Sequence, residues 1–195
     1  MKPVVVGVLA LQGAFAKHIE MLLLLGVKAL EVRKPEELAE CDALIIPGGE
    51  STTIMKQMNF IEFTDPFRRF AEKKPVFGTC AGLILMSKEI ISDKMQAFNL
   101  MDISVERNAF GRQVESFHVD LDLKLPSSKS HHFDAVFIRA PRIRSMGKEV
   151  KMLASFEGEP VLVQQGHHLG ATFHPELTHD SAIHAYFLSL IRNFY

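Results

Sequence analysis

The most reactive side chain in the sequence stands between two glycines. Cys80 lies in Gly78-Thr79-Cys80-Ala81-Gly82, after a stretch typical of a buried strand and before one typical of a helix. A cysteine in such a turn is a nucleophile elbow, where flanking glycines avoid clashes with the strained central residue. The N–H groups that begin the helix favour the thiolate, the form that attacks a carbonyl carbon. A small buried cysteine in an ordinary turn explains this segment equally well.

A second cluster lies far downstream, in Phe173-His174-Pro175-Glu176. His174 and Glu176 are two residues apart, so on an extended chain their side chains share one face. The carboxylate can then accept one imidazole N–H and leave the other nitrogen facing Cys80. Alone, this histidine reads as a loop or packing residue, since the chain has nine histidines. Together with the elbow, the pair predicts a Cys80–His174–Glu176 triad that cleaves an amide.

A third segment, Pro47-Gly48-Gly49-Glu50-Ser51-Thr52, also joins a predicted strand to a predicted helix. A Gly-Gly backbone can present N–H groups to a ligand without side chains in the way, as an oxyanion hole or a phosphate-binding loop requires. The phosphate interpretation is weak because no lysine follows at Walker spacing. The non-functional alternative is an ordinary turn in which Ser51 caps the helix.

The elements around these motifs indicate an α/β fold. In the first hundred residues, predicted strands (4–11, 29–32, 43–46 and 75–77) alternate with helical segments (14–25, 35–39, from about 52, 66–73 and 81–88). Such alternation predicts a parallel sheet with helices on both faces. Later segments (113–125, 136–138, 151–156, 161–164 and 169–173) resemble short, partly antiparallel strands, and 180–194 has helical spacing. We expect a three-layer sandwich, flavodoxin-like, with a central mostly parallel sheet and an antiparallel extension.

Composition narrows the class of protein. The 195 residues, 47% of them hydrophobic, suffice for one core, so we expect a single domain over residues 1–195. Lys and Arg number 22 against 23 Asp and Glu, a balance that lacks the basic footprint of nucleic-acid or anionic-membrane binding. The apolar start is interrupted by Gln12 and Gly13 and reads as a strand rather than a signal peptide. Two cysteines fit a reducing compartment, so we expect a cytoplasmic protein.

The histidine pairs His131-His132 and His167-His168 do not predict a metal site. Neighbours on a strand face opposite ways, and no cysteine or acidic cluster completes either pair. We interpret these histidines as solvent-facing or packing residues, and residues 127–132 as a variable loop. No metal and no cofactor is expected.

The motifs together resemble the class I glutamine amidotransferases, and the resemblance covers nearly the whole chain. The cysteine elbow and His-Pro-Glu are shared by all triad amidotransferases. Three further segments point to the branch of glutaminase subunits of pyridoxal 5′-phosphate synthase: Leu11-Gln12-Gly13, Arg107-Asn108-Ala109-Phe110-Gly111-Arg112-Gln113 and Phe137-Ile138-Arg139-Ala140-Pro141. The resemblance implies that Cys80, His174 and Glu176 form the triad, with oxyanion donors at Gly49 and Ala81. It implies contacts with L-glutamine from six residues: Gly49, Glu50, Ser51, Arg107, Ile138 and Arg139.

The resemblance also implies a reaction and a partner. Glutamine is hydrolysed to glutamate and ammonia through a thioester, and the ammonia passes to a barrel-shaped synthase subunit. That subunit makes pyridoxal 5′-phosphate, a form of vitamin B6, from ribose 5-phosphate and glyceraldehyde 3-phosphate. Two alternatives stay open. The chain could serve a different synthase, such as imidazole glycerol phosphate synthase, or it could be a non-catalytic binding module on the same fold.

Overall fold

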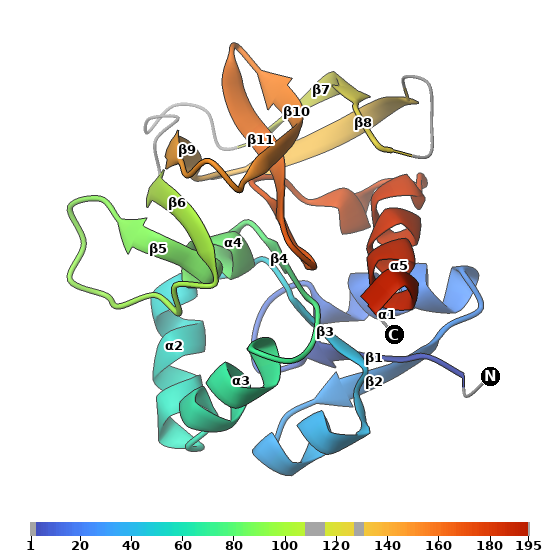
Figure 1. The fold of residues 1–195 in the computed structure, drawn as a ribbon, viewed down its shortest axis with the longest axis vertical. Coiled ribbons are helices and arrows are strands. Elements are labelled where there is room, and N and C mark those ends of the chain that lie inside the picture. The colour runs from blue at the N-terminus through green and yellow to red at the C-terminus, as the bar shows by residue number, and fades with distance from the viewer. Residues whose placement is uncertain (1–2, 108–115, 127–130, 195) are drawn as a thin grey trace.

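The fold is described by a computed structural model that covers residues 3–107, 116–126 and 131–194. Its centre is a seven-stranded sheet (Figure 1). In spatial order the strands are β10 (Lys151–Phe156), β11 (Glu159–Gln165), β12 (His168–Ala171), β4 (Val76–Thr79), β3 (Ala43–Ile46), β1 (Val5–Leu9) and β2 (Lys28–Val32). The five strands from β12 to β2 are parallel, whereas β10, β11 and β12 pair antiparallel. The expected mostly parallel sheet with an antiparallel extension is therefore confirmed.

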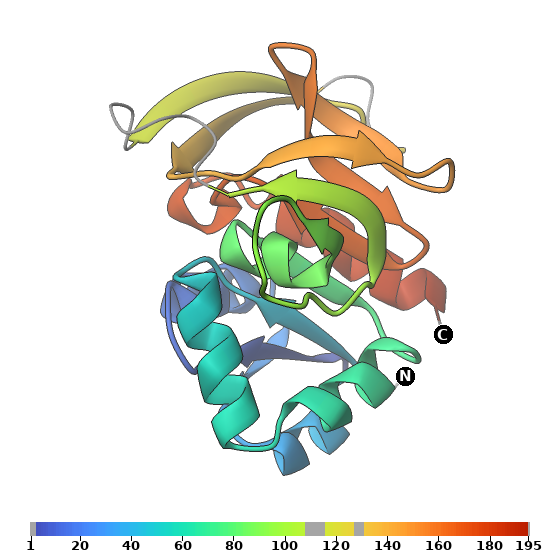
Figure 2. The same ribbon diagram turned by 90° about the vertical axis from the view of Figure 1, so that its left-hand side faces the viewer.

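Helices cover both faces of this sheet, as buried parallel strands require (Figures 1 and 2). Strand β3 shows why: Ala43 and Ile45 pack into one apolar cluster and Leu44 and Ile46 into the other. The first cluster includes residues of α1 (Phe15–Leu24) and α5 (Ala182–Phe194). The second includes residues of α2 (Ser51–Phe60), α3 (Thr64–Ala71), α4 (Ala81–Met86) and η1 (Pro35–Glu40). The alternation of apolar side chains thus produces the three layers.

Two smaller sheets lie beside the central sheet, next to its antiparallel part (Figure 1). One consists of β5 (Ser87–Ile90), β6 (Met101–Glu106) and β9 (Arg142–Met146), and the other is a hairpin of β7 (Ser116–Leu123) and β8 (His131–Ile138). The hairpin packs on the core through aromatic rings, such as those of Phe137 and Phe173, whose centroids are 5.4 Å apart. These sheets bring Arg107, which follows β6, and Arg139, which follows β8, to one rim of the central sheet.

Three sequence predictions need correction here. The helix expected over 81–88 ends at Met86, because Ser87 begins β5. Strands β5, β6 and β9 were not predicted. The loop expected over 127–132 lies outside the described residues up to 130, but His131 and His132 belong to β8 and face Asp180 and Asp120 at 2.6 and 3.2 Å. The part of the prediction for 113–125 that falls on residues 113–115 also lies outside the described residues.

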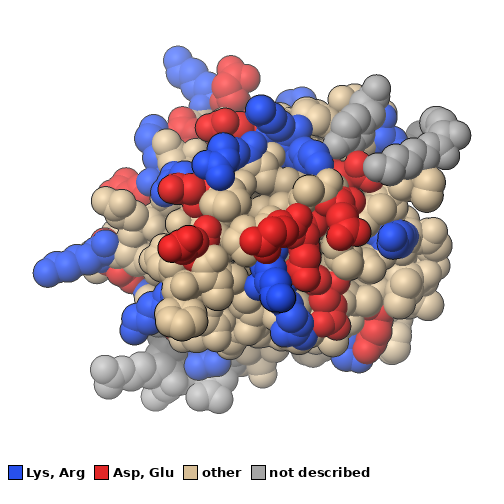
Figure 3. Space-filling model, turned by 90° about the horizontal axis from the view of Figure 1, so that it is seen from below, with Lys and Arg blue, Asp and Glu red and all other residues tan. Residues whose placement is uncertain are grey.

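The surface seen from below carries both signs of charge, with Lys and Arg interspersed among Asp and Glu (Figure 3). Such mixing fits the formal net charge of −1. Within the described residues, no helix is both long and apolar enough to cross a membrane.

Candidate functional site

Cys80 occupies a strained turn at the carboxyl end of β4. Its backbone adopts φ 48° and ψ −102°, and its N–H donates to the carbonyl of Ala171 on β12 at 2.8 Å. A Cβ at Gly82 would lie 2.1 Å from the Ile46 carbonyl oxygen, and one at Gly78 would lie 2.6 Å from the Gly82 carbonyl carbon. Both positions therefore require glycine. The elbow predicted from the sequence is confirmed as a backbone geometry, and it holds Cys80 where the chain leaves the sheet.

His174 and Glu176 follow β12, the strand next to β4, so parallel pairing brings them to the same rim as Cys80. The backbone N–H of His174 donates to the Val136 carbonyl at 2.8 Å, and the ring nitrogen Nδ1 lies 2.7 Å from Glu176 Oε1. Both side chains are nearly or fully buried. A Cβ at Gly48 would lie only 2.2 Å from His174 Cε1, so the glycine leaves room for the imidazole ring.

The electrostatics of the pair favour a charged imidazole beside a carboxylate. Burial alone would lower the pKa of His174, but hydrogen bonds with Cys80 and Glu176, and the charges of both, outweigh it and raise the pKa to about 10. Burial would raise the pKa of Glu176, yet the nearby His18 and His174 lower it below its usual value. The raised pKa of His174 thus has causes in both Cys80 and Glu176, as the predicted triad requires.

The Gly-Gly segment forms the opposite wall. Glu50 is the N-cap of α2, and its carboxylate accepts the backbone N–H groups of Thr52 and Thr53 at 3.2 and 2.7 Å. Burial would raise the pKa of Glu50, but hydrogen bonds from both threonines lower it to about 2. The alternative that Ser51 caps this helix is therefore wrong. Ser51 Oγ is instead buried with no hydrogen-bond partner in the described part of the chain, on the wall of the pocket.

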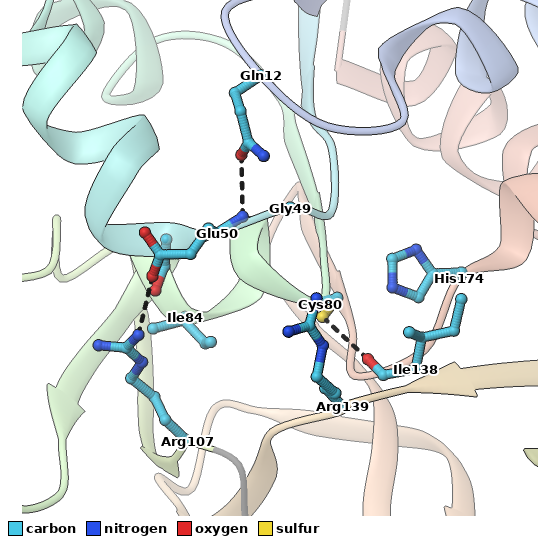
Figure 4. A pocket seen from close by; sticks show the side chains of 10 residues that line it. Gln12, Gly49, Glu50, Cys80, Ile84, Arg107, Ile138, Arg139 and His174 are labelled. Carbon is cyan, nitrogen blue, oxygen red and sulfur yellow. Dashed lines mark hydrogen bonds and ion pairs between the residues drawn. The ribbon is translucent and has the colours of Figure 1, made fainter. Parts of the chain in front are cut away.

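The two arginines of the resemblance differ in their partners. Arg107 Nη2 lies 3.1 Å from Glu50 Oε1 (Figure 4). Its Nη1 lies 2.5 Å from Asp93 Oδ2. Arg139 is exposed, adopts φ 42°, and forms no ion pair within residues 3–107, 116–126 and 131–194. Of the two guanidinium groups, Arg139 is the one that no carboxylate of the described residues pairs with.

These walls enclose a pocket of about 270 Å³ (Figure 4). Most predicted site residues line it: Gly49, Glu50, Ser51, Cys80, Arg107, Ile138, Arg139 and His174. Glu176 lies behind His174, and Ala81 begins α4 without lining the pocket. Ile138 contributes its side chain to the wall and its carbonyl to the Cys80 thiol, with Sγ 3.8 Å from the oxygen. The volume suits a small amino acid, since pockets for drug-sized ligands are about 300–1,000 Å³.

Sequence reasoning missed two lining residues and one partner of a lining residue. Gln12 reaches the wall through its Oε1, which accepts the Glu50 N–H at 2.9 Å, and Ile84 comes from α4. Asp93 pairs with Arg107 from outside the wall. The Leu-Gln-Gly motif pointed to Gln12, but no sequence signal indicated Asp93. Within the described ranges, no group of three or more His, Cys, Asp or Glu side chains is arranged to hold a metal ion.

The fold and the geometry of the pocket define an α/β protein with a cysteine nucleophile elbow and a neighbouring His–Glu pair. Residues 8–193 match the model of the SNO glutamine amidotransferase family, and the chain belongs to this family.

Relatives of similar length support the membership. The protein named pyridoxal 5′-phosphate synthase subunit PdxT from Niallia circulans is 51% identical over 188 residues, 96% of this chain and 97% of the relative. The protein of that name from Pelotomaculum thermopropionicum is 53% identical over 184 residues, 94% and 93% of the two chains. A crystal structure described as a glutamine amidotransferase is similar with a TM-score of 0.89 and 49% identity, over 96% of this chain and 98% of that one.

Proposed function

We propose that the chain hydrolyses L-glutamine to L-glutamate and ammonia as the glutaminase subunit of a pyridoxal 5′-phosphate synthase. The observation that carries the proposal is that Cys80 and His174 line one pocket of amino-acid size, while Glu176 lies behind His174 and contacts its Nδ1 at 2.7 Å. Relatives about half identical over nearly their full length carry the name of that synthase subunit, which supports the particular synthase. The two free thiols, Cys41 and Cys80, fit a cytoplasmic location.

The chemistry begins with the Cys80 thiolate attacking the side-chain amide carbon of glutamine. The tetrahedral oxygen is held by N–H groups near Gly49 and Ala81, and protonated His174 donates its proton to the departing ammonia. Once the thioester has formed, Cys80 is no longer an anion, so one cause of the raised His174 pKa is gone. His174 can then accept a proton from water, which hydrolyses the γ-glutamyl thioester to glutamate.

Glutamine itself is an amino acid whose carboxylate and ammonium need opposite charges. Arg139 can pair with the carboxylate, because it forms no ion pair with the described residues, whereas Arg107 already contacts Glu50 and Asp93. The Glu50 carboxylate stays ionised to low pH and can accept hydrogen bonds from the ammonium. The buried Ser51 Oγ has no partner among the described residues and can gain one from the substrate. Arg107 then acts mainly by holding Glu50 in place.

We propose further that docking of the synthase subunit switches the glutaminase on. The Gly48 carbonyl accepts a hydrogen bond from the Ala14 N–H at 3.2 Å, and the Gln12 side-chain oxygen accepts one from the Glu50 N–H. Rotation of the Gly48–Gly49 peptide would therefore break one hydrogen bond to residues beside the Leu11-Gln12-Gly13 turn. A partner seated on this turn could shift the orientation of an oxyanion donor, whose loss typically costs about 10²–10³ in rate.

The test compares glutamine hydrolysis by the free chain and by its complex with the synthase subunit, each as wild type, Cys80→Ala and Gln12→Ala. We expect low activity for the free wild-type chain, high activity for the complex, and none above background for Cys80→Ala in either form. Appreciable activity of Cys80→Ala would refute the triad. Equal rates for the free and bound wild-type chains would refute only the switch, and activation that survives Gln12→Ala would place the partner contact elsewhere.

A further inference from the structure

A buried pair of histidines lies directly behind the proposed triad. His18 on α1 and His184 on α5 are fully buried, and His18 Nδ1 lies 2.9 Å from His184 Nε2. The other nitrogen of His18, Nε2, faces Glu176 Oε2 at 3.4 Å and Thr79 Oγ1 at 3.2 Å. Thr79 directly precedes Cys80 in the chain. Side chains from α5, from β4 and from the segment after β12 thus meet at the imidazole ring of His18.

The contact of His18 with Glu176 matters because it involves the second carboxylate oxygen, Oε2. Oε1 binds His174, whereas Oε2 is buried and has no hydrogen bond of ordinary length from the described residues. A buried carboxylate oxygen without a donor is costly. His18 Nε2 lies slightly beyond the ordinary range, close enough for one N–H to be shared between Glu176 and Thr79.

The tautomers of both rings follow from their surroundings. His184 Nδ1 is buried and has no partner in the described part of the chain, so a proton there would be an unsatisfied donor. The single proton of neutral His184 therefore belongs on Nε2, where it donates to His18 Nδ1. Because His18 Nδ1 then accepts, the proton of neutral His18 stands on Nε2 and points to Glu176 and Thr79. Burial lowers the pKa of both histidines, which fits neutral rings.

The opposite arrangement would cost more. With the His18 proton on Nδ1, His184 Nε2 would accept and its Nδ1–H would be buried without a partner. The bare lone pair of His18 Nε2 would also face a carboxylate oxygen of Glu176 at 3.4 Å, so two acceptors would face each other without a proton between them. The first arrangement leaves one acceptor, His184 Nδ1, without a partner among the described residues, whereas the opposite one leaves both a buried donor and Glu176 Oε2 unpaired there.

We propose that His18 is a positioning residue for the catalytic carboxylate: its Nε2–H donates to Glu176 Oε2, and His184 sets the tautomer that makes this possible. The inference rests on the triad assigned under the proposed function. Glu176, held at both oxygens, keeps a single orientation toward His174. His18 touches neither substrate nor Cys80, so it acts on kcat through Glu176 and leaves glutamine binding unchanged.

The test uses the full chain in complex with the synthase subunit and two matched amides at position 18. In His18→Gln the amide nitrogen reaches the place of Nε2, whereas in His18→Asn it reaches only the place of Nδ1. We expect His18→Gln to stay near the wild-type kcat, and His18→Asn to lose roughly tenfold in kcat at unchanged KM, as for a lost hydrogen bond to a charged group. Equal kcat values for the two variants, or a loss confined to KM, would overturn the proposal.

A double-mutant cycle separates positioning from a general structural effect. In a Glu176→Ala background, His18→Asn should cause no further loss of kcat, because the group through which it acts is gone. Equal losses in both backgrounds would overturn the role of His18 while leaving the triad intact. If Glu176→Ala itself retained the wild-type kcat, the triad and this inference would both fail.

A spectroscopic measurement does not depend on the folding of any variant. ¹⁵N chemical shifts of the histidine rings in the wild-type protein distinguish the two neutral tautomers. We expect His18 and His184 both to carry their proton on Nε2. A proton on Nδ1 of His18 would overturn the proposal.

Discussion

The two walls of the pocket are built differently. On one wall His174 and Glu176 are buried, with side chains 9% and 0% exposed, and a second layer of buried histidines supports them. On the other, Glu50 and Arg107 are 46% and 23% exposed and are held by ion pairs near the surface. The backbone differs too, since the elbow fits tightly against Ile46, whereas the Gly48–Glu50 strip is fastened through Gln12 and Ala14.

This difference separates chemistry from recognition. Hydrogen bonds in a buried, low-dielectric site are strong and costly to leave unmade, so the triad wall has one geometry. Exposed ion pairs contribute little and exchange partners readily, so the recognition wall can adapt to glutamine. The wall that must be ready before the substrate arrives is the buried one, and the wall that can respond to substrate or partner is the exposed one.

The largest loss of activity is expected from Glu176→Gln, on the buried wall. The amide keeps the shape but removes the charge that orients His174 and raises its pKa. In serine triads the comparable change costs about 10⁴ in kcat, and we expect a loss approaching that size here. Steady-state glutaminase assays of the complex measure it. Near-normal activity would make Glu176 a bystander.

A smaller loss of activity is expected from Gly48→Ala, because Gly48 is the point at which the exposed wall packs against His174 of the buried wall. The new Cβ would lie 2.2 Å from His174 Cε1, so the imidazole must move or the strip must shift. Misplacement of a catalytic group by about 1 Å can cost about 10²-fold in rate. Gly158→Ala is a control at another glycine, because nothing lies within 4 Å of a Cβ there, although its φ of 80° adds strain. Equal activity of the two variants would contradict the packing of Gly48 against His174.

The pH dependence of kcat tests the raised pKa of His174 on the buried wall. His174, with its pKa raised to about 10, stays protonated through neutral pH and loses its proton as the pH rises through about 10. Release of ammonia needs that proton, so kcat should hold between about pH 7 and 9 and fall only near pH 10. An ordinary histidine would lose its proton near pH 6.5. A decline of kcat already at pH 7 would contradict the raised pKa.

The smallest effect is expected at Cys41→Ser, because the second cysteine belongs to neither wall. Cys41 is buried beneath the sheet, donates to the Glu37 carbonyl at 3.4 Å, and burial raises the pKa of its thiol to about 11. Such a thiol is inert at neutral pH. Serine keeps the donor, so we expect unchanged kcat and a modest fall in melting temperature. A large loss of kcat with the fold intact would show that the site extends further than the pocket.

The sequence predicted the buried wall better than the exposed one. The elbow follows from local rules, since a glycine pair around a cysteine and a strand–turn–helix pattern identify it within five residues. The His–Glu pair needs only its spacing and its place after a strand. By contrast, the alternative of Ser51 as a helix cap is wrong, because the Glu50 side chain accepts the N–H groups of Thr52 and Thr53. The partners of Arg107 lie 14 and 57 residues away, so no local pattern indicates them.

The lack of a local sequence pattern also explains why three strands and the two histidines behind the triad were not predicted. Strands β5, β6 and β9 are short and form a separate three-stranded sheet, where the alternation of buried residues is irregular. His18 occupies an ordinary helical position, and its partner His184 lies 166 residues away. A single histidine on a helix predicts nothing until the fold places it beside the carboxylate.

The most direct test of the central claim is to trap the covalent intermediate. The complex is mixed with glutamine, quenched in acid during turnover, digested and analysed by mass spectrometry, with Cys80→Ala treated in parallel. We expect a γ-glutamyl thioester on the peptide that contains Cys80, and no adduct in the variant. Turnover of glutamine without an adduct on Cys80, or an adduct on Cys41 alone, would contradict it.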